Sequence, residues 1–145
     1  MLFRSDGVAL AFSGDTADCP EFWQMTHDDP ALKAVIVECS YPASMKEMAS
    51  LSMHLDTSAL VPRLAALPTG VTAVVIHRKP GGEEQIAIEL KAGLPGKDLR
   101  LPVSGEVLRF SARFRCAYRA GAAKLPGLGW QYRLLSPAGL ANLAR

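Results

Sequence analysis

Short runs of apolar residues recur along the first half of the chain, and each of them stops at a polar residue. The runs cover residues 8–12, 34–38 and 71–76. Nearly continuous apolar runs of this length are typical of strands that are covered on both faces. The pattern therefore predicts three buried β-strands with polar groups at their carboxyl ends.

Segments of helical composition lie between and after these strands. They cover residues 21–25, 44–52, 57–67 and 83–92. The third segment places Leu60, Leu64 and Leu67 on one face. Asp56 or Thr57 can cap its first turn. Strands that alternate with helices predict an α/β fold with a largely parallel sheet, in which polar residues at the strand ends gather at one rim.

The pattern changes beyond Gly93 to short β-like runs that glycine and proline separate. These runs cover residues 99–101, 106–110, 113–119 and 130–135. The first two flank a Pro-Val-Ser-Gly segment and predict a β-hairpin, and residues 137–145 could form a terminal helical turn. We therefore divide the chain into an α/β part over residues 1–110 and a β-rich extension of unknown role over residues 111–145.

The composition is that of a globular protein. Of the 145 residues, 49% are apolar and 21% are charged. No apolar run approaches the roughly 20 residues of a membrane-spanning helix, and the N-terminus lacks the apolar stretch of a secretory signal. The three cysteines have no C-x-x-C spacing and indicate neither a disulfide framework nor a thiolate zinc site. We expect a soluble, cytoplasmic protein with no membrane partner.

The net charge of +2 conceals an asymmetry along the chain. Residues 1–96 carry a net charge of −5, and residues 97–145 carry +7. An acidic part can hold cations, and a basic part can meet phosphates or pack against the acidic part. The basic residues from Lys97 onward are interleaved with glycine, proline and apolar residues, as on the outer face of strands. A nucleic-acid partner is therefore not favoured.

Four residues at strand ends or helix starts could carry chemistry: Asp15, Glu38, His54 and His77. Asp15 could bind a cation or simply occupy a turn, and His77 could ligate a metal or bond at a strand terminus. His54 could act as a general acid or only lie near a helix cap. Glu38 could orient His54 or be solvated. No residue type alone decides between these alternatives.

A charged pair, Arg78 and Lys79, directly follows His77. These two side chains could meet a phosphate dianion, although such a pair after a strand is usually exposed.

Five motifs in order carry a resemblance to a known family. They are S-G-D-T (13–16), V-I-V-E-C-S-Y-P (35–42), M-H-L-D-T (53–57), V-V-I-H-R-K-P (74–80) and I-A-I-E-L (86–90). The ordered set resembles the C-terminal half of class II cyclic-nucleotide phosphodiesterases, which belong to the metallo-β-lactamase superfamily. The resemblance spans about residues 3–110 and implies the C-terminal half of an αββα sandwich.

The resemblance also implies a role for each candidate residue. Asp15 looks like the aspartate that bridges two metal ions, and His77 looks like the final histidine ligand of the second ion. His54 looks like the histidine that protonates the leaving oxygen, and Glu38 looks like the carboxylate that steadies it. The cofactor would be two divalent ions, most readily zinc, which activate a water. The substrate would be a cyclic nucleotide or another small phosphodiester.

The chain also departs from this family. The His-x-His-x-Asp-His metal loop has no counterpart, because the chain has three histidines and no two are two residues apart. Asp15 and His77 are too few ligands for two ions. We therefore expect a fragment that is inactive alone, whose partner is the missing N-terminal half or a second copy. The alternative is a non-catalytic, degenerate phosphate- or nucleotide-binding module that holds no metal.

Overall fold

The computed structural model describes residues 1–5, 7–110 and 115–117. The chain divides into two compact units, Met1–Leu101 and Pro102–Arg145, and each is described by itself below. The division that the sequence suggests at residue 110 stays a prediction.

The first unit is built on a five-stranded sheet. Its strands are β1 (Leu2–Ser5), β2 (Val8–Phe12), β3 (Leu32–Glu38), β4 (Thr72–Ile76) and β5 (Leu99–Arg100), and they lie in this order across the sheet. The strands β2 to β5 are parallel, and only β1 pairs antiparallel with its neighbour. The prediction of an α/β fold with a largely parallel sheet is confirmed.

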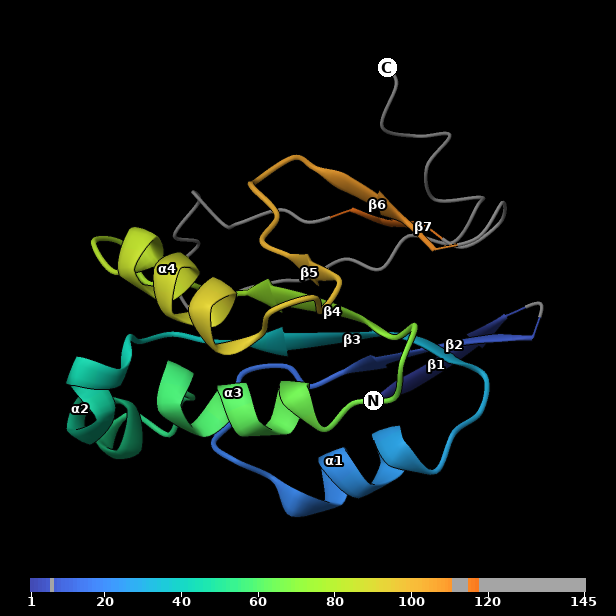
Figure 1. The fold of residues 1–145 in the computed structure, drawn as a ribbon, viewed down its shortest axis with the longest axis horizontal. Coiled ribbons are helices and arrows are strands. Elements are labelled where there is room, and N and C mark those ends of the chain that lie inside the picture. The colour runs from blue at the N-terminus through green and yellow to red at the C-terminus, as the bar shows by residue number, and fades with distance from the viewer. Residues whose placement is uncertain (6, 111–114, 118–145) are drawn as a thin grey trace, which may run out of the picture. The chain divides into compact units, whose positions relative to one another are not determined.

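Helical segments connect the strands. They are α1 (Pro20–His27), the 3-10 turn η1 (Ala43–Met45), α2 (Lys46–Leu51), α3 (Thr57–Ala65) and α4 (Glu83–Gly93). Figure 1 shows that the arrows of β3 and β4 point toward the end of the sheet where α2 lies. The short helix α2 is therefore close to the carboxyl ends of these strands.

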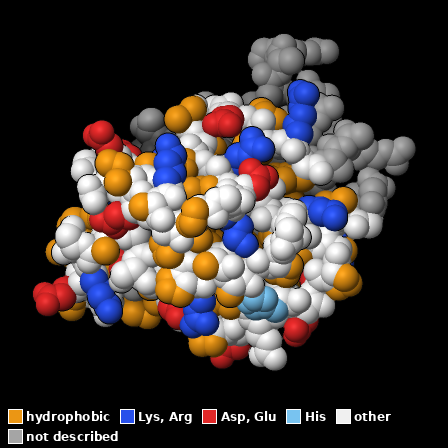
Figure 2. Space-filling model, viewed as in Figure 1, with side chains coloured by type: hydrophobic (Ala, Val, Ile, Leu, Met, Phe, Trp, Pro, Cys, Tyr) orange, Lys and Arg blue, Asp and Glu red, His pale blue; other side chains and the backbone are white. Residues whose placement is uncertain are grey.

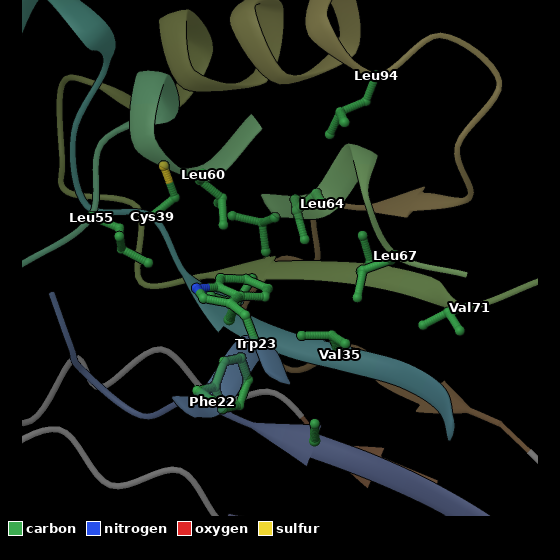
Figure 3. Close-up of a cluster of buried hydrophobic side chains, with 14 of the residues drawn as sticks. Phe22, Trp23, Val35, Cys39, Leu55, Leu60, Leu64, Leu67, Val71 and Leu94 are labelled. Atoms are coloured by element: carbon green, nitrogen blue, oxygen red, sulfur yellow. The ribbon is translucent and has the colours of Figure 1, made fainter. Parts of the chain in front are cut away.

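One face of the sheet packs against α1, α3 and α4. The shared core contains Trp23 from α1, Leu60 and Leu64 from α3, Leu90 from α4 and Val35 from the sheet. Figure 3 shows Leu60, Leu64 and Trp23 side by side over the strands. Complete burial of one leucine side chain contributes about 1.5–3 kcal/mol, so this face supplies much of the folding free energy.

The start of α3 is determined by its cap. The Asp56 side chain accepts hydrogen bonds from the backbone N–H groups of Ser58 and Ala59. These bonds satisfy donors that have no partner within the helix. Of the two caps that the sequence allows, the structure uses Asp56.

The other face of the sheet carries alternate residues of the same strands. Leu10, Ile36 and Val74 lie on this second face, because successive side chains of a strand point to opposite faces of the sheet. Self-association and a missing half as partner stay predictions.

The first strand was not anticipated from the sequence. β1 pairs with β2 in the register Ser5↔Val8, and Gly7 in the turn has a φ of 74°. An Asp-Gly pair between two short strands is a strong signal for a tight hairpin, because glycine adopts positive φ at no steric cost. Asp6-Gly7 was therefore a signal in the sequence that pointed to this hairpin.

The predicted hairpin between residues 99–101 and 106–110 is wrong. β5 instead extends the parallel sheet beside β4. In the second unit, β6 (Val107–Arg109) pairs antiparallel with β7 (Arg115–Ala117). β7 falls within the expected strand over residues 113–119, whereas residues 130–145 lie outside the described residues.

Charges of both signs are interspersed over the face of the molecule that Figure 2 shows. In the part of the chain that the structure describes, no helix combines the length and apolar character that crossing a membrane requires. The cytoplasmic location stays a prediction.

Candidate metal and acid–base site

The structure brings the four candidate residues together at one end of the sheet. Glu38 is the last residue of β3, and Asp15 and His77 follow β2 and β4. His54 comes from the connection between α2 and α3 and reaches the same place. The carboxyl ends of parallel strands meet at one edge, so residues far apart in the sequence become neighbours there.

Glu38 is a completely buried carboxylate with three donors around it. Its Oε1 lies 2.7 Å from Nδ1 of His54 and accepts the backbone N–H of Thr16 at 3.0 Å. Its Oε2 accepts the Ser40 hydroxyl at 2.8 Å. A buried carboxylate is tolerated only when its oxygens are satisfied in this way. Glu38 therefore holds one nitrogen of His54 and leaves Nε2 for other partners.

The backbone before His54 turns sharply. Met53 has a φ of 59°, in the left-handed region, and the His54 N–H donates to the carbonyl of Ala49 at 2.9 Å. The His54 ring stands edge to face against the ring of Tyr41 and keeps a side-chain exposure of 15%. A histidine that is bonded on one nitrogen and partly open to solvent has the environment of an acid–base group.

His77 also adopts a left-handed backbone conformation, with a φ of 58°. This conformation is uncommon for residues other than glycine and is often found at functional sites. The imidazole is buried, and its Nδ1 lies 3.1 Å from Oδ1 of Asp15. Its Nε2 lies 3.3 Å from Nζ of Lys79.

Burial lowers the pKa of His77 to about 4, from an ordinary value of 6.5. The Asp15 carboxylate opposes this shift, whereas Lys79 and His54 add to it. His77 is therefore neutral at pH 7. A carboxylate only accepts and an ammonium only donates, so Nδ1 carries the proton and Nε2 is the acceptor.

Three side chains could share one cation. Ligand atoms of Glu38, His54 and His77 lie within 4.8 Å of one another, and the rings of the two histidines are 5.1 Å apart. Asp15 contacts His77 but is not in that group. Imidazole and carboxylate are ordinary zinc ligands, and a catalytic zinc ion keeps three protein ligands. Among the described residues, these donors suit one divalent ion and are too few for the expected two.

Three residues at the site received no definite role from the sequence. Thr16 and Ser40 bond to Glu38, and Lys79 contacts His77. Ser40 follows Glu38 by two positions in an extended segment, and such residues point to the same side. That spacing was a usable signal. Arg78 points elsewhere, since its guanidinium donates to the carbonyl of Leu101 at 3.3 Å.

Cys19 and Cys39 are not among the side chains that the described part of the structure brings to this site. Cys19 and Cys39 are free thiols. Burial raises the pKa of the Cys39 thiol far above its usual range, and nearby carboxylates add to the shift. Cys39 is therefore an inert core residue, as the absence of C-x-x-C spacing suggests.

The fold of the chain is similar to part of a metallo-β-lactamase fold. The solved structures that match include the metallo-β-lactamase fold protein YhfI from Bacillus subtilis, with a TM-score of 0.57 and 16% sequence identity. The match covers 70% of this chain and 40% of YhfI, so the chain spans less than half the length of that protein. No family model and no curated protein matches the sequence. The likeness establishes the fold, and activity and substrate remain to be proposed.

Proposed function

We propose that the chain supplies the C-terminal half of the active site of a metal-dependent phosphodiester hydrolase of the metallo-β-lactamase superfamily. The observation that carries this proposal is the buried Glu38 carboxylate that holds His54 beside His77 and Asp15. A cyclic nucleotide or another small phosphodiester is the proposed substrate. The similarity of fold and the order of the sequence motifs support the same conclusion.

The His54 imidazole would donate a proton to the leaving oxygen. Glu38 holds its Nδ1, so Nε2 is the atom that can exchange a proton with a substrate. The same carboxylate fixes the orientation of the imidazole ring, as a positioned proton donor requires. A bound divalent ion would supply an activated water and neutralise phosphoryl charge. Asp15 and His77 are the proposed metal ligands, whereas Glu38 and His54 form the proposed acid–base pair beside them.

The chain is expected to need a second half for activity. The described donors suit one ion, and the chain spans 40% of the metallo-β-lactamase fold protein that it resembles. The remaining ligands would come from a preceding segment or from a separate chain. Catalysis by the 145-residue chain alone is therefore not expected.

The test has two stages. First, the purified chain is assayed for metal by plasma mass spectrometry and for hydrolysis of bis-(p-nitrophenyl) phosphate with zinc or manganese. We expect less than one metal ion per chain and no turnover. Second, the DNA upstream of Met1 is read for an in-frame segment that encodes His-x-His-x-Asp-His, and the longer protein is assayed in the same way. A longer protein with this segment that takes up metal but hydrolyses no phosphodiester would refute the proposal.

Variants of the longer protein test the residue roles. Asp15→Ala and His77→Ala should each lose metal and turnover, because each removes a proposed ligand. His54→Ala should keep its metal and lose about 100-fold or more in turnover, as expected for a general acid. Loss of metal in His54→Ala would reassign His54 as a ligand.

The second candidate is a degenerate phosphate- or nucleotide-binding module. The Lys79 ammonium within 3.3 Å of His77 favours it, since a cation already stands beside that imidazole. If no upstream segment encodes the metal loop, titration calorimetry of the chain with inorganic phosphate and a cyclic nucleotide decides the case. Binding without metal would support this candidate.

A further inference from the structure

Lys79 lies against Nε2 of His77, the ring nitrogen that does not face the Asp15 carboxylate. Its Nζ is 3.3 Å from Nε2, while Nδ1 of the same ring faces the Asp15 carboxylate. A carboxylate on one nitrogen and a cation on the other is the arrangement of a metal-bound histidine, whose outer nitrogen donates to an acid. Here the cation beside Nε2 is the Lys79 ammonium.

Two backbone hydrogen bonds fix the position of the Lys79 main chain. The Lys79 N–H donates to the carbonyl of Ser40 at 3.2 Å, and the Lys79 carbonyl accepts the N–H of Gly82 at 3.1 Å. The first bond ties Lys79 to the segment after β3, and the second leads into α4. Lys79 therefore starts from a defined position at the rim of the site.

Nε2 of His77 has a single lone pair, so it can accept either the Lys79 ammonium or a metal ion, but not both. An ammonium has donors only, so Nε2 must offer its lone pair to Lys79. A proton on Nδ1, which faces the Asp15 carboxylate at 3.1 Å, meets this requirement and leaves the lone pair on Nε2. A divalent ion would take the same lone pair. The ammonium and the ion cannot both occupy it.

We propose that Lys79 caps Nε2 of His77 in the metal-free protein and that a divalent ion must displace this ammonium in order to bind. The inference rests on the metal-binding function proposed above. In the metal-free protein this contact keeps the proton of His77 on Nδ1 and holds the ring in place. It also weakens metal affinity, because the contact must be broken before the ion binds and because the ammonium repels the ion.

Zinc affinity of the full chain tests the cap. Zinc is titrated against a chromophoric chelator with the natural chain, Lys79→Met, Lys79→Arg and the control Lys91→Met, whose lysine lies in the exposed last turn of α4. Lys79→Met should bind zinc at least about tenfold more tightly, since a hydrogen bond to a charged group is lost in the metal-free state. Lys91→Met should match the natural chain. Equal or weaker binding in Lys79→Met would overturn the inference.

A second readout needs no metal. Nitrogen-15 NMR of the His77 ring, assigned with His77→Gln, should show an unprotonated Nε2 whose resonance shifts in Lys79→Met and not in Lys91→Met. An unchanged Nε2 resonance would overturn the inference even if zinc affinity changed. A shifted resonance with no zinc binding in any variant would support the cap and reject the proposed metal site, so the two failures are distinguishable.

Discussion

Replacement of Glu38 tests whether the site is held together by its buried carboxylate. Glu38→Ala leaves three donors without their acceptor: the Thr16 N–H, the Ser40 hydroxyl and His54 Nδ1. An unsatisfied buried donor costs about 1–3 kcal/mol, and three donors lose their acceptor here. We expect Glu38→Ala to lower the free energy of unfolding by about 3–5 kcal/mol, a large share of the stability of a small domain.

Glu38→Gln separates loss of charge from loss of shape. Its amide oxygen can face His54 and Thr16, while its amide group donates to the Ser40 hydroxyl, so we expect a loss of only about 1–2 kcal/mol. Because Glu38→Ala could fail to fold, the glutamine variant keeps the test decisive. The control is Glu84→Ala, at an exposed position in the first turn of α4, where a loss below about 1 kcal/mol is expected.

The assay is urea unfolding followed by circular dichroism at pH 7, with the slope compared among variants so that a change in compactness is detected. The expected order of stability is the natural chain with Glu84→Ala, then Glu38→Gln, then Glu38→Ala. If Glu38→Ala were as stable as the control, the carboxylate would not be the common acceptor that holds Thr16, Ser40 and His54. The proposed acid–base pair would then lack its support.

Three further predictions concern stability. The folded pKa of His77 is about 4 against 6.5 for the free group, so the unfolded chain takes up the proton first as the pH falls. The contribution of His77 to the free energy of unfolding is therefore complete above pH 6.5, and up to about 3 kcal/mol of it is lost as the pH falls from 6.5 to 4. Urea unfolding at a series of pH values should show this loss, and His77→Gln should reduce it. Asp56→Ala removes the cap from the Ser58 and Ala59 N–H groups and should cost about 1 kcal/mol in the same assay; no loss would mean that water replaces the cap. Leu64→Ala in the core should cost about 2–5 kcal/mol, and a cost below about 1 kcal/mol would contradict the packing of α3 on the sheet.

The sequence was informative where a local pattern has one structural solution. The apolar runs around residues 8–12, 34–38 and 71–76 became β2, β3 and β4, because a run of this kind can bury itself only within a covered sheet. Reasoning from strand ends also placed Asp15, Glu38 and His77 correctly at one edge of the sheet.

The sequence was less informative where pairing partners decide the outcome. The segment around Leu99 has the pattern of a hairpin strand, yet it pairs in parallel with β4. Two short strands separated by a turn have several possible neighbours, and the pattern of a single segment does not distinguish between them. The missed strand β1 is different, since its Asp-Gly turn was a readable signal.

The sequence by itself determined the kinds of groups available and the edge at which they collect, because parallel strands align their carboxyl ends whatever their exact packing. Only the tertiary structure decided which groups touch. Burial of Glu38 brings it within 2.7 Å of His54, and the left-handed backbone at His77 presents its two nitrogens to Asp15 and Lys79. Such contacts depend on where each side chain points and on what surrounds it. Residues that are tens of positions away in the sequence determine both.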